Sequence, residues 1–306
     1  MPSLLSLVPS DRTTRGQRTR RTTEKVACEL ASAGIDVSPN TVGKLCKCLG
    51  YRLRSNAKKL NRKKDPGRDA QFAYIATMQE AFAQAGLPVV SVDAKHRELV
   101  GDLKHPEPAW DSEPALVLDH DFPSDASGVA LPYGVYDLRA NEACVSFGTT
   151  HDSADFAVDN LARWWDCHDR ARCPKASELL VLADCGGSNG ARSRAWKHGL
   201  QHRLSDPYGL SVTVCHYPSG ASKDNPIEHR VLSEISKNWA GQPLRDYETV
   251  VKCVSTTATQ TGLRGDAHLV QADYPTGIKI SDKEMKDPSI RHHDIQPNRN
   301  YTISPK

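Results

Sequence analysis

The sequence predicts an α/β protein in which a mixed five-stranded sheet has helices on both faces. Two observations support this fold class: apolar segments with the two-residue period of strands alternate with segments that have the period of helices, and a strongly basic segment precedes them. The composition, 38% hydrophobic and 25% charged residues, is ordinary for a soluble globular protein. The 306 residues are enough for one large domain and one smaller domain.

Charge is distributed unevenly between the two ends of the chain. Residues 1–70 hold 16 lysines and arginines against 6 aspartates and glutamates, so their net charge is +10. The remaining residues carry −7, which brings the whole chain to +3. A basic segment joined to an acidic body indicates that the front of the chain meets a polyanion, and nucleic acid is the expected partner. Since no secretory leader or membrane-spanning apolar run is found, a cytoplasmic location is expected.

Residues 1–62 are predicted to form a basic helix-turn-helix. A first amphipathic helix ends at Gly34, and a second begins with Ser38 as its N-cap and Pro39 in its first turn. Two short helices joined by a tight turn are typical of a DNA-reading motif, although a plain helical hairpin with a solvated basic linker has the same pattern. The side chains expected to contact DNA are Asn40, Thr41, Lys44 and Lys47 on the second helix and Arg52, Arg54, Lys58 and Lys59 after it.

A linker and lead-in helix over residues 63–86 connect this segment to the predicted sheet. Strands are expected at residues 87–94, 133–138, 143–149, 178–184 and 210–216, with helices at 153–168, 188–204 and 225–239. A short turn makes the second and third strands a hairpin, and helical crossovers make the fourth and fifth parallel to the first. This gives the order 3-2-1-4-5 of a ribonuclease H-like core over residues 87–242. Residues 95–130 are an insertion, and residues 243–306 are predicted to be one helix and a polar tail.

Three carboxylates fall where such a sheet would bind a metal. Asp93 and Asp184 each end an apolar strand, and neighbouring parallel strands end at the same edge of a sheet. Glu228 falls in the first turn of the helix after the fifth strand, where Asn225 is the expected cap. Bringing carboxylates within about 4 Å of each other costs about 4 kcal/mol per pair at an effective dielectric constant near 20. Two Mg²⁺ ions offset that cost, and such pairs of ions catalyse phosphodiester chemistry.

Each of these residues also has a simpler interpretation. An aspartate at the end of a strand often forms a turn, and a glutamate in the first turn of a helix often only complements the helix dipole. The run DCGGSNG suggests a dinucleotide-binding turn, but its glycines are spaced GGxxG and it follows the fourth strand, not the first. Cys167, His168 and Cys173 are the nearest approach to a zinc cluster, and they lack a second pair at zinc-site spacing.

Long stretches of the sequence are similar to one family. They include SVDAKHRELVGDLKH, PYGVYD, LLVLADCGGSNGARSRAWKHGLQ, HYPSGASKDNPIEHRVLS and TATQTGL. These stretches resemble the Rhodopirellula-type DDE transposases of the ISAzo insertion-sequence group, and the resemblance runs from about Leu4 to the NYTI at 300–303.

The resemblance implies a ribonuclease H-like catalytic core that uses two Mg²⁺ or Mn²⁺ ions, with Asp93, Asp184 and Glu228 as the catalytic and metal-binding triad. It implies DNA transposition, in which an element end is cleaved and the freed 3′-hydroxyl attacks target DNA without a covalent protein intermediate. The expected partners are element ends, target DNA and further copies of the chain, in the bacterial nucleoid. The residues that flank the triad and are expected to hold DNA phosphates, although solvated or capping roles fit them equally, are Lys95, Lys223, Asn225, His229 and Arg230.

Four features depart from the family pattern. Family members usually carry a further basic helix-turn-helix before the point where this chain starts, so a short form is expected. His96 stands where lysine is usual, Asp224 stands where tryptophan is usual, and Arg299 replaces the tryptophan of WNYTI. Two alternatives to an active transposase remain: a truncated or inactive remnant that only binds DNA, and a ribonuclease H-type nuclease that cuts without joining.

Overall fold

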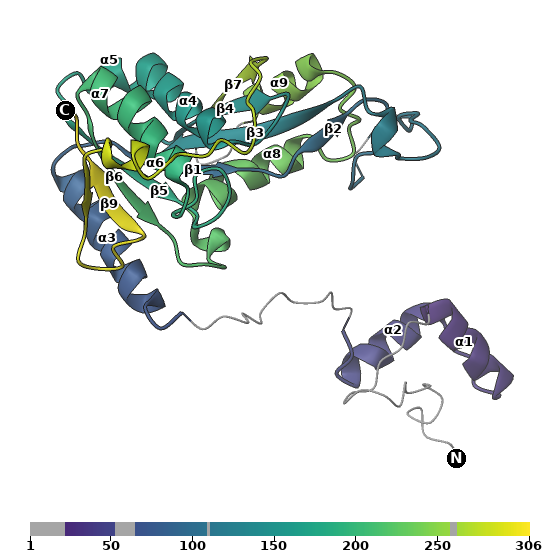
Figure 1. Cartoon of the computed structure of the whole chain (residues 1–306). Helices are drawn as coiled ribbons and strands as arrows, with labels where there is room; N and C mark the ends of the chain where they lie inside the picture. Colours follow the sequence, from purple (N-terminus) through teal and green to yellow (C-terminus); the bar gives the residue numbers. More distant parts are fainter. Residues whose placement is uncertain (1–21, 53–64, 109–110, 258–261) are drawn as a thin grey trace. The chain divides into compact units, whose positions relative to one another are not determined.

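The computed structural model describes residues 22–52, 65–108, 111–257 and 262–306 (Figure 1). The chain divides into two compact units, residues 1–61 and residues 62–306. Three of the predicted DNA contacts, Arg54, Lys58 and Lys59, lie outside the described residues. No described helix is long and apolar enough to cross a membrane.

Two short helices make up the described part of the first unit, α1 (Thr23–Ser32) and α2 (Pro39–Cys48). The Ser38 hydroxyl accepts a hydrogen bond from the main chain of α2 at its start, as an N-cap does. Ala27 and Leu30 of α1 pack against Val42 of α2 and form a small core. The two predicted helices are confirmed, and their identity as a DNA-reading helix-turn-helix stays a prediction.

The second unit is built around a mixed sheet that has nine strands among the described residues. Their order is β7-β4-β3-β1-β5-β6-β9-β8, with β2 paired to β3 off this path. β3 is antiparallel to both β1 and β4, while β5 and β6 run parallel to β1. The path β4-β3-β1-β5-β6 therefore has the predicted order 3-2-1-4-5, and the ribonuclease H-like fold class is confirmed. The strands are β1 (Val89–Ala94), β2 (Glu98–Val100), β3 (Gly128–Asp137), β4 (Glu142–Gly148), β5 (Glu178–Ala183), β6 (Ser211–His216), β7 (Arg264–Val270), β8 (Ile290–His292) and β9 (Asn300–Ile303).

The prediction of a five-stranded sheet is wrong in number. β2 lies in the predicted insertion at 95–130, and β7, β8 and β9 lie in the residues predicted to be a polar tail. β7 has the sequence RGDAHLV and buries only Val270 fully, because it stands at the edge of the sheet. β8 and β9 have three and four residues. Segments this short or this polar show no two-residue period of apolar side chains, so the sequence pattern does not reveal them.

Helices cover both faces of the sheet (Figure 1). On one face, α4 and α6 pack against the strands through Trp164 and Trp196. On the other face, α8 and α9 cover β3 and β4, and α3 covers β5 and β6. The helices are α3 (Arg68–Gln84), α4 (Ala154–Trp164), α5 (Arg170–Arg172), α6 (Arg194–Leu200), α7 (Asp206–Tyr208), α8 (Ser233–Asn238) and α9 (Tyr247–Ser255), with 3-10 turns η2 (Pro123–Asp125), η5 (Ser222–Asp224) and η7 (Glu284–Lys286).

Each of the three helices predicted between and after the strands contains a π-helical turn. These turns are η3 (Trp165–Asp169), η4 (Gln201–Ser205) and η6 (Glu228–Leu232). A π-helical turn accommodates an extra residue within a helix, changes the directions of its side chains, and is frequent at functional sites. Two of the three turns, η6 and η3, contain residues of the two sites described below.

Candidate active site

The carboxyl ends of β1 and β5 meet at one edge of the sheet. The two strands are parallel, and their register pairs Val92 with Ala183. Asp93 and Asp184 are the next residues along each chain, so they lie side by side at this edge. The Asp93 carboxylate accepts a hydrogen bond from the Ala94 N–H at 2.8 Å, which fixes its position at the end of the strand.

Polar groups from β6 and the segment after it hold Asp184. Ser222 Oγ donates a hydrogen bond to Asp184 Oδ2 at 2.6 Å, and Asn225 Nδ2 donates to Oδ1 at 3.3 Å. The His216 ring contacts the Asp184 main-chain oxygen through Nδ1 at 2.8 Å. Burial lowers the pKa of His216 to about 4, so the ring is neutral and donates the Nδ1 proton to that carbonyl. Both the main chain and the carboxylate of Asp184 are therefore held in place.

Glu228 begins the π-helical turn η6, and its side chain contacts the Asp93 carboxyl. Ser91 Oγ on β1 accepts a hydrogen bond from the Ile227 N–H at 3.1 Å and donates one to the Asn225 side chain. Ser91 thus caps the start of this helical segment. The prediction that the Asn225 side chain is the cap is wrong, because this fully buried amide instead points at the sheet and bonds Asp184.

A glycine lets the segment with Glu228 approach the sheet closely. Gly134 of β3 pairs in register with Asp93. A Cβ atom at position 134 would lie 2.7 Å from Ile227 Cδ1, closer than carbon atoms pack. The missing side chain therefore makes room for the fully buried Ile227, which directly precedes Glu228.

The three carboxylates interact electrostatically. Burial, the charge of Asp184 and the contact with Glu228 together raise the pKa of Asp93 to about 9. A divalent cation bound among these groups would remove that repulsion, and carboxylate oxygens are the ligands that Mg²⁺ prefers. The donor set therefore fits such an ion. The ligand atoms of the three carboxylates do not all lie within 4.8 Å of one another. The described residues form two other groups whose ligand atoms do.

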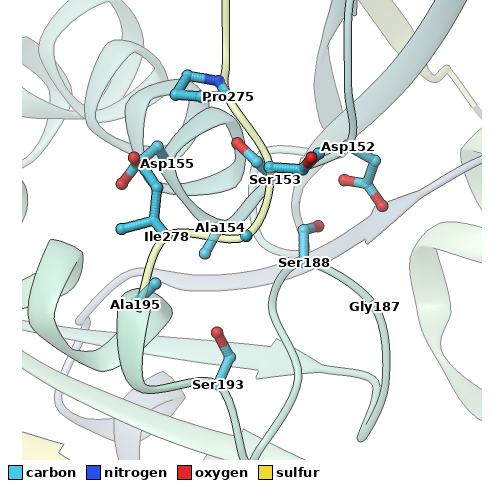
Figure 2. A pocket seen from close by; sticks show the side chains of 12 residues that line it. Asp152, Ser153, Ala154, Asp155, Gly187, Ser188, Ser193, Ala195, Pro275 and Ile278 are labelled. Atoms are coloured by element: carbon cyan, nitrogen blue, oxygen red, sulfur yellow. The ribbon is translucent and has the colours of Figure 1, made fainter. Parts of the chain in front are cut away.

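Tyr133 and Asp152 also lie at this edge, and no sequence pattern pointed to them. The Tyr133 hydroxyl is buried without a hydrogen-bond partner among the described residues, and burial together with the charges of Asp93 and Asp152 raises its pKa. Asp152 follows β4, which runs parallel to β1, so it reaches the same edge; burial raises its pKa as well. Together with Ser188 and Pro275, Asp152 lines a cavity of about 300 Å³ (Figure 2).

A larger cavity, of about 960 Å³, begins at Asp184. We call it the basic groove, because the charged side chains that line it besides Asp184 are Arg192, Arg194, Lys197 and Arg299. These four residues were not predicted to contact DNA. Their signal in the sequence, SNGARSRAWK, reads as the start of a helix, and only the folded chain brings Arg299 from the C-terminal strand region beside it.

The cations of the basic groove differ in how firmly they are held. Arg194 pairs with Asp282 at 2.7 Å, and Lys197 lies over the Tyr301 ring, 4.8 Å from its centroid. The Arg192 side chain is exposed, and within the described ranges it forms no ion pair. Within the described ranges, Arg192 is therefore an unpaired cation of the groove, whereas Arg194 and Lys197 are already positioned by the fold.

Two of the departures from the family pattern form ion pairs with residues at the start of α3 or just before it. Asp224 lies 3.5 Å from Arg68, and Arg299 pairs with Asp65 at 2.6 Å. The Asp224 charge is thereby partly neutralised. A third departure, His96, has an exposed side chain.

The residues beside the triad that were predicted to contact DNA differ in their side-chain partners and exposure. Lys95 forms an ion pair with Glu98 and lies over the Trp239 ring, so its charge is already partnered. Arg230 donates a hydrogen bond to a tyrosine hydroxyl, that of Tyr136, at 3.1 Å. Lys223 is exposed on η5.

In the first unit, the predicted DNA-contacting side chains of α2 are all exposed: Asn40, Thr41, Lys44 and Lys47. Arg52 folds back on the end of this helix, where its guanidinium donates to the Lys47 carbonyl at 2.6 Å and to the Tyr51 carbonyl at 2.9 Å. An exposed face with two lysines is compatible with a DNA phosphate contact, and Arg52 supports the helix end.

Comparison with known proteins identifies the family of the chain. The family model described as the Rhodopirellula transposase DDE domain matches residues 9–305. No curated protein matches the chain. Similar solved structures include the Mos1 transposase paired-end complex with left transposon end, at 15% identity over 81% of this chain and 68% of that one, with a TM-score of 0.46. The Mos1 mariner paired end complex with Mn is 15% identical over 76% of this chain and 65% of that one, with a TM-score of 0.45.

Proposed function

The chain belongs to the family of Rhodopirellula transposase DDE domains and is a DNA transposase of an insertion sequence, and we propose that Asp93, Asp184 and Glu228 are its catalytic residues. The observation that supports this proposal is that the Asp184 charge and the contact with Glu228 both act on the buried Asp93 carboxyl at one edge of the sheet, where the pKa of Asp93 is raised to about 9. Such repulsion is typical of a site that binds divalent cations.

The three carboxylates would hold two Mg²⁺ or Mn²⁺ ions. When bound, ions of this kind lower the pKa of a water or hydroxyl nucleophile and neutralise charge on the phosphate and the leaving oxygen. The chain's own groups position the ligands: Ser222 and Asn225 orient the Asp184 carboxylate, and the Ala94 N–H orients that of Asp93. This arrangement supplies a preorganised site for phosphodiester chemistry.

The reaction has two displacements at phosphorus. Water first attacks the phosphate that joins the element end to the flanking DNA. The bond between that phosphorus and the 3′ oxygen of the element breaks, and the element end keeps a free 3′-hydroxyl. That hydroxyl then attacks a phosphate of target DNA, so one P–O bond forms as another breaks and no oxidant or external energy source is required. The first displacement alone would make the chain a nuclease, and the second makes it a transposase.

DNA would enter along the basic groove, since this cavity begins at Asp184 and carries Arg192 and Lys197 on its walls. The exposed face of α2 would read the element end. Pairing of two element ends requires two active sites, so the working form would be a homo-oligomer on DNA.

A strand-transfer assay tests the proposal. Purified chain is mixed with Mg²⁺, a plasmid target and labelled DNA that carries the inverted repeat flanking the reading frame. The expected result is cleavage and joining, both reduced about a thousandfold or more in Asp184→Asn and unchanged in Asp119→Asn, whose side chain is 92% exposed. Binding without cleavage would support the remnant, cleavage without joining the nuclease, and full joining by Asp184→Asn would contradict the catalytic assignment.

A further inference from the structure

A second group of metal-ligating side chains lies where α4 runs into η3 over strands β4 and β7. The ligand atoms of Cys144, His168 and His268 all lie within 4.8 Å of one another. The Asp266 carboxylate lies 3.1 Å from His268 Nε2 and 3.7 Å from His168 Nε2. We propose that these four residues form a structural Zn²⁺ site, which is independent of the catalytic carboxylates.

The strand register explains why these residues meet. β4 and β7 are parallel neighbours, and Cys144 pairs directly with Asp266, so both side chains point to the same face of the sheet. His268 stands two residues beyond Asp266 and therefore faces the same side. This is the face covered by α4, because Cys144 packs in the same cluster as Trp164. The fourth residue, His168, comes down from the π-helical turn η3.

The two histidines have unused ligand atoms that point at this group. The Nε2 atoms of His168 and His268 are both buried, and within the described residues neither forms a hydrogen bond. Their approach to Asp266 has the distance of an ion pair but not the geometry of a hydrogen bond. A buried ring nitrogen without a partner is costly, and coordination of a cation would satisfy both at once.

The donor set selects the metal. One thiol, two imidazoles and one carboxylate are ligands that Zn²⁺ takes in a tetrahedral arrangement. Mg²⁺ prefers oxygen ligands alone, so this group does not compete with the catalytic carboxylates for the same ion. A cavity of about 80 Å³ lined by Cys144, His168 and Asp266 leaves room for an ion and its approach. The Cys144 thiol would lose its proton to solvent on binding.

The site would fasten an edge of the sheet. β7 is an edge strand from the C-terminal part of the chain, and among the described strands its one partner is β4. A zinc ion bound by both strands and by η3 would link three elements that are distant in sequence. Cys167 and Cys173, the cysteines nearest to His168 in sequence, are not members of the cluster.

Co²⁺ binding to the full-length chain, after treatment with a chelator, tests this site. Co²⁺ replaces Zn²⁺ in tetrahedral sites, and a bound thiolate gives a charge-transfer absorption band that carboxylate ligands do not. The expected result is such a band at one Co²⁺ per chain, displaced by Zn²⁺. Cys144→Ser should abolish the band, and Cys167→Ser, the matched exposed cysteine, should keep it.

His268→Ala provides a second variant, because its side chain is 36% exposed and its loss leaves the core intact. We expect Co²⁺ affinity to fall by at least about tenfold in this variant. A band that is absent from the unaltered chain, persists in Cys144→Ser or disappears in Cys167→Ser would overturn the proposal. Asp184→Asn should leave the band unchanged, so the failure of this site and of the catalytic assignment are separate results.

Discussion

The two polar clusters of the sheet unit differ in charge and in the strands that carry them. The carboxylates that we propose to be catalytic lie where the central strands β1 and β5 end, and burial together with their like charges raises the pKa of Asp93 to about 9. The cluster of Cys144, His168, His268 and Asp266 lies at the edge strand β7 and combines neutral donors with one carboxylate. In our proposals the first arrangement opposes folding and would serve chemistry, whereas the second would stabilise the fold once a metal binds.

The largest expected effect comes from replacing one carboxyl group of the first cluster by a neutral amide. Asp93→Asn removes the repulsion but keeps an acceptor for the Ala94 N–H. We expect strand transfer to fall about a thousandfold or more, while the midpoint of thermal unfolding in chelator rises by at least about 2 °C. Activity assays and thermal denaturation measure the two effects.

Cys144→Ser is the matched change at the second cluster. This variant should keep strand transfer and lose the stabilisation that Zn²⁺ gives the unaltered chain. If Asp93→Asn unfolds at a lower temperature, or if Cys144→Ser loses strand transfer, the division of the two clusters into a chemical one and a structural one is wrong.

The basic groove should account for much of the DNA affinity near the first cluster. Replacing both Arg192 and Lys197 by glutamine removes two cations from its wall. We expect the dissociation constant of the DNA complex to rise at least about tenfold at moderate salt. The slope of log affinity against log salt should fall in magnitude by about 2. Arg170→Gln, a surface arginine paired with Asp166 outside the groove, is the control and should leave the slope unchanged.

A smaller effect is expected from the residue that orients Asp184. Ser222→Ala removes the 2.6 Å hydrogen bond to the carboxylate. Strand transfer should fall about tenfold, the usual consequence of losing a group that orients a metal ligand, and added Mg²⁺ should partly restore it. Ser233→Ala, which loses only a bond to the His229 carbonyl, should match the unaltered chain. Equal rates for the two variants would show that Ser222 does not position the site.

The same contrast between the two clusters explains which of their residues could be predicted from the sequence. Asp93 lies near the end of β1 and Asp184 directly follows β5. Both strands are apolar and central in the sheet, so their pattern is clear and both residues could be placed at one edge from the sequence. Ser222 and Asn225 could not, because their hydrogen bonds to Asp184 depend on how the chain turns after β6. The prediction that Glu228 begins a helix near that edge agrees with η6, and its catalytic role stays a prediction.

The second cluster was out of reach of sequence patterns for a different reason. Asp266 and His268 belong to β7, whose polar sequence was predicted to be part of a tail. Cys144 meets them through the β4–β7 register, which pairs it with Asp266, a residue 122 positions later in the chain. Spacing in the sequence singled out Cys167, His168 and Cys173, of which His168 belongs to the cluster, since local cysteine patterns identify only metal sites built from neighbouring residues.

One measurement tests the catalytic assignment most directly, because the sheet edge holds two candidates for the third carboxylate. Glu228 contacts Asp93, and the charges of both Asp93 and Asp152 act on the buried Tyr133 hydroxyl. Strand transfer by Glu228→Gln and Asp152→Asn should be compared in the same Mg²⁺-dependent reaction. We predict that Glu228→Gln loses joining about a thousandfold or more and that Asp152→Asn keeps it; full joining by Glu228→Gln, with loss in Asp152→Asn, would contradict the account.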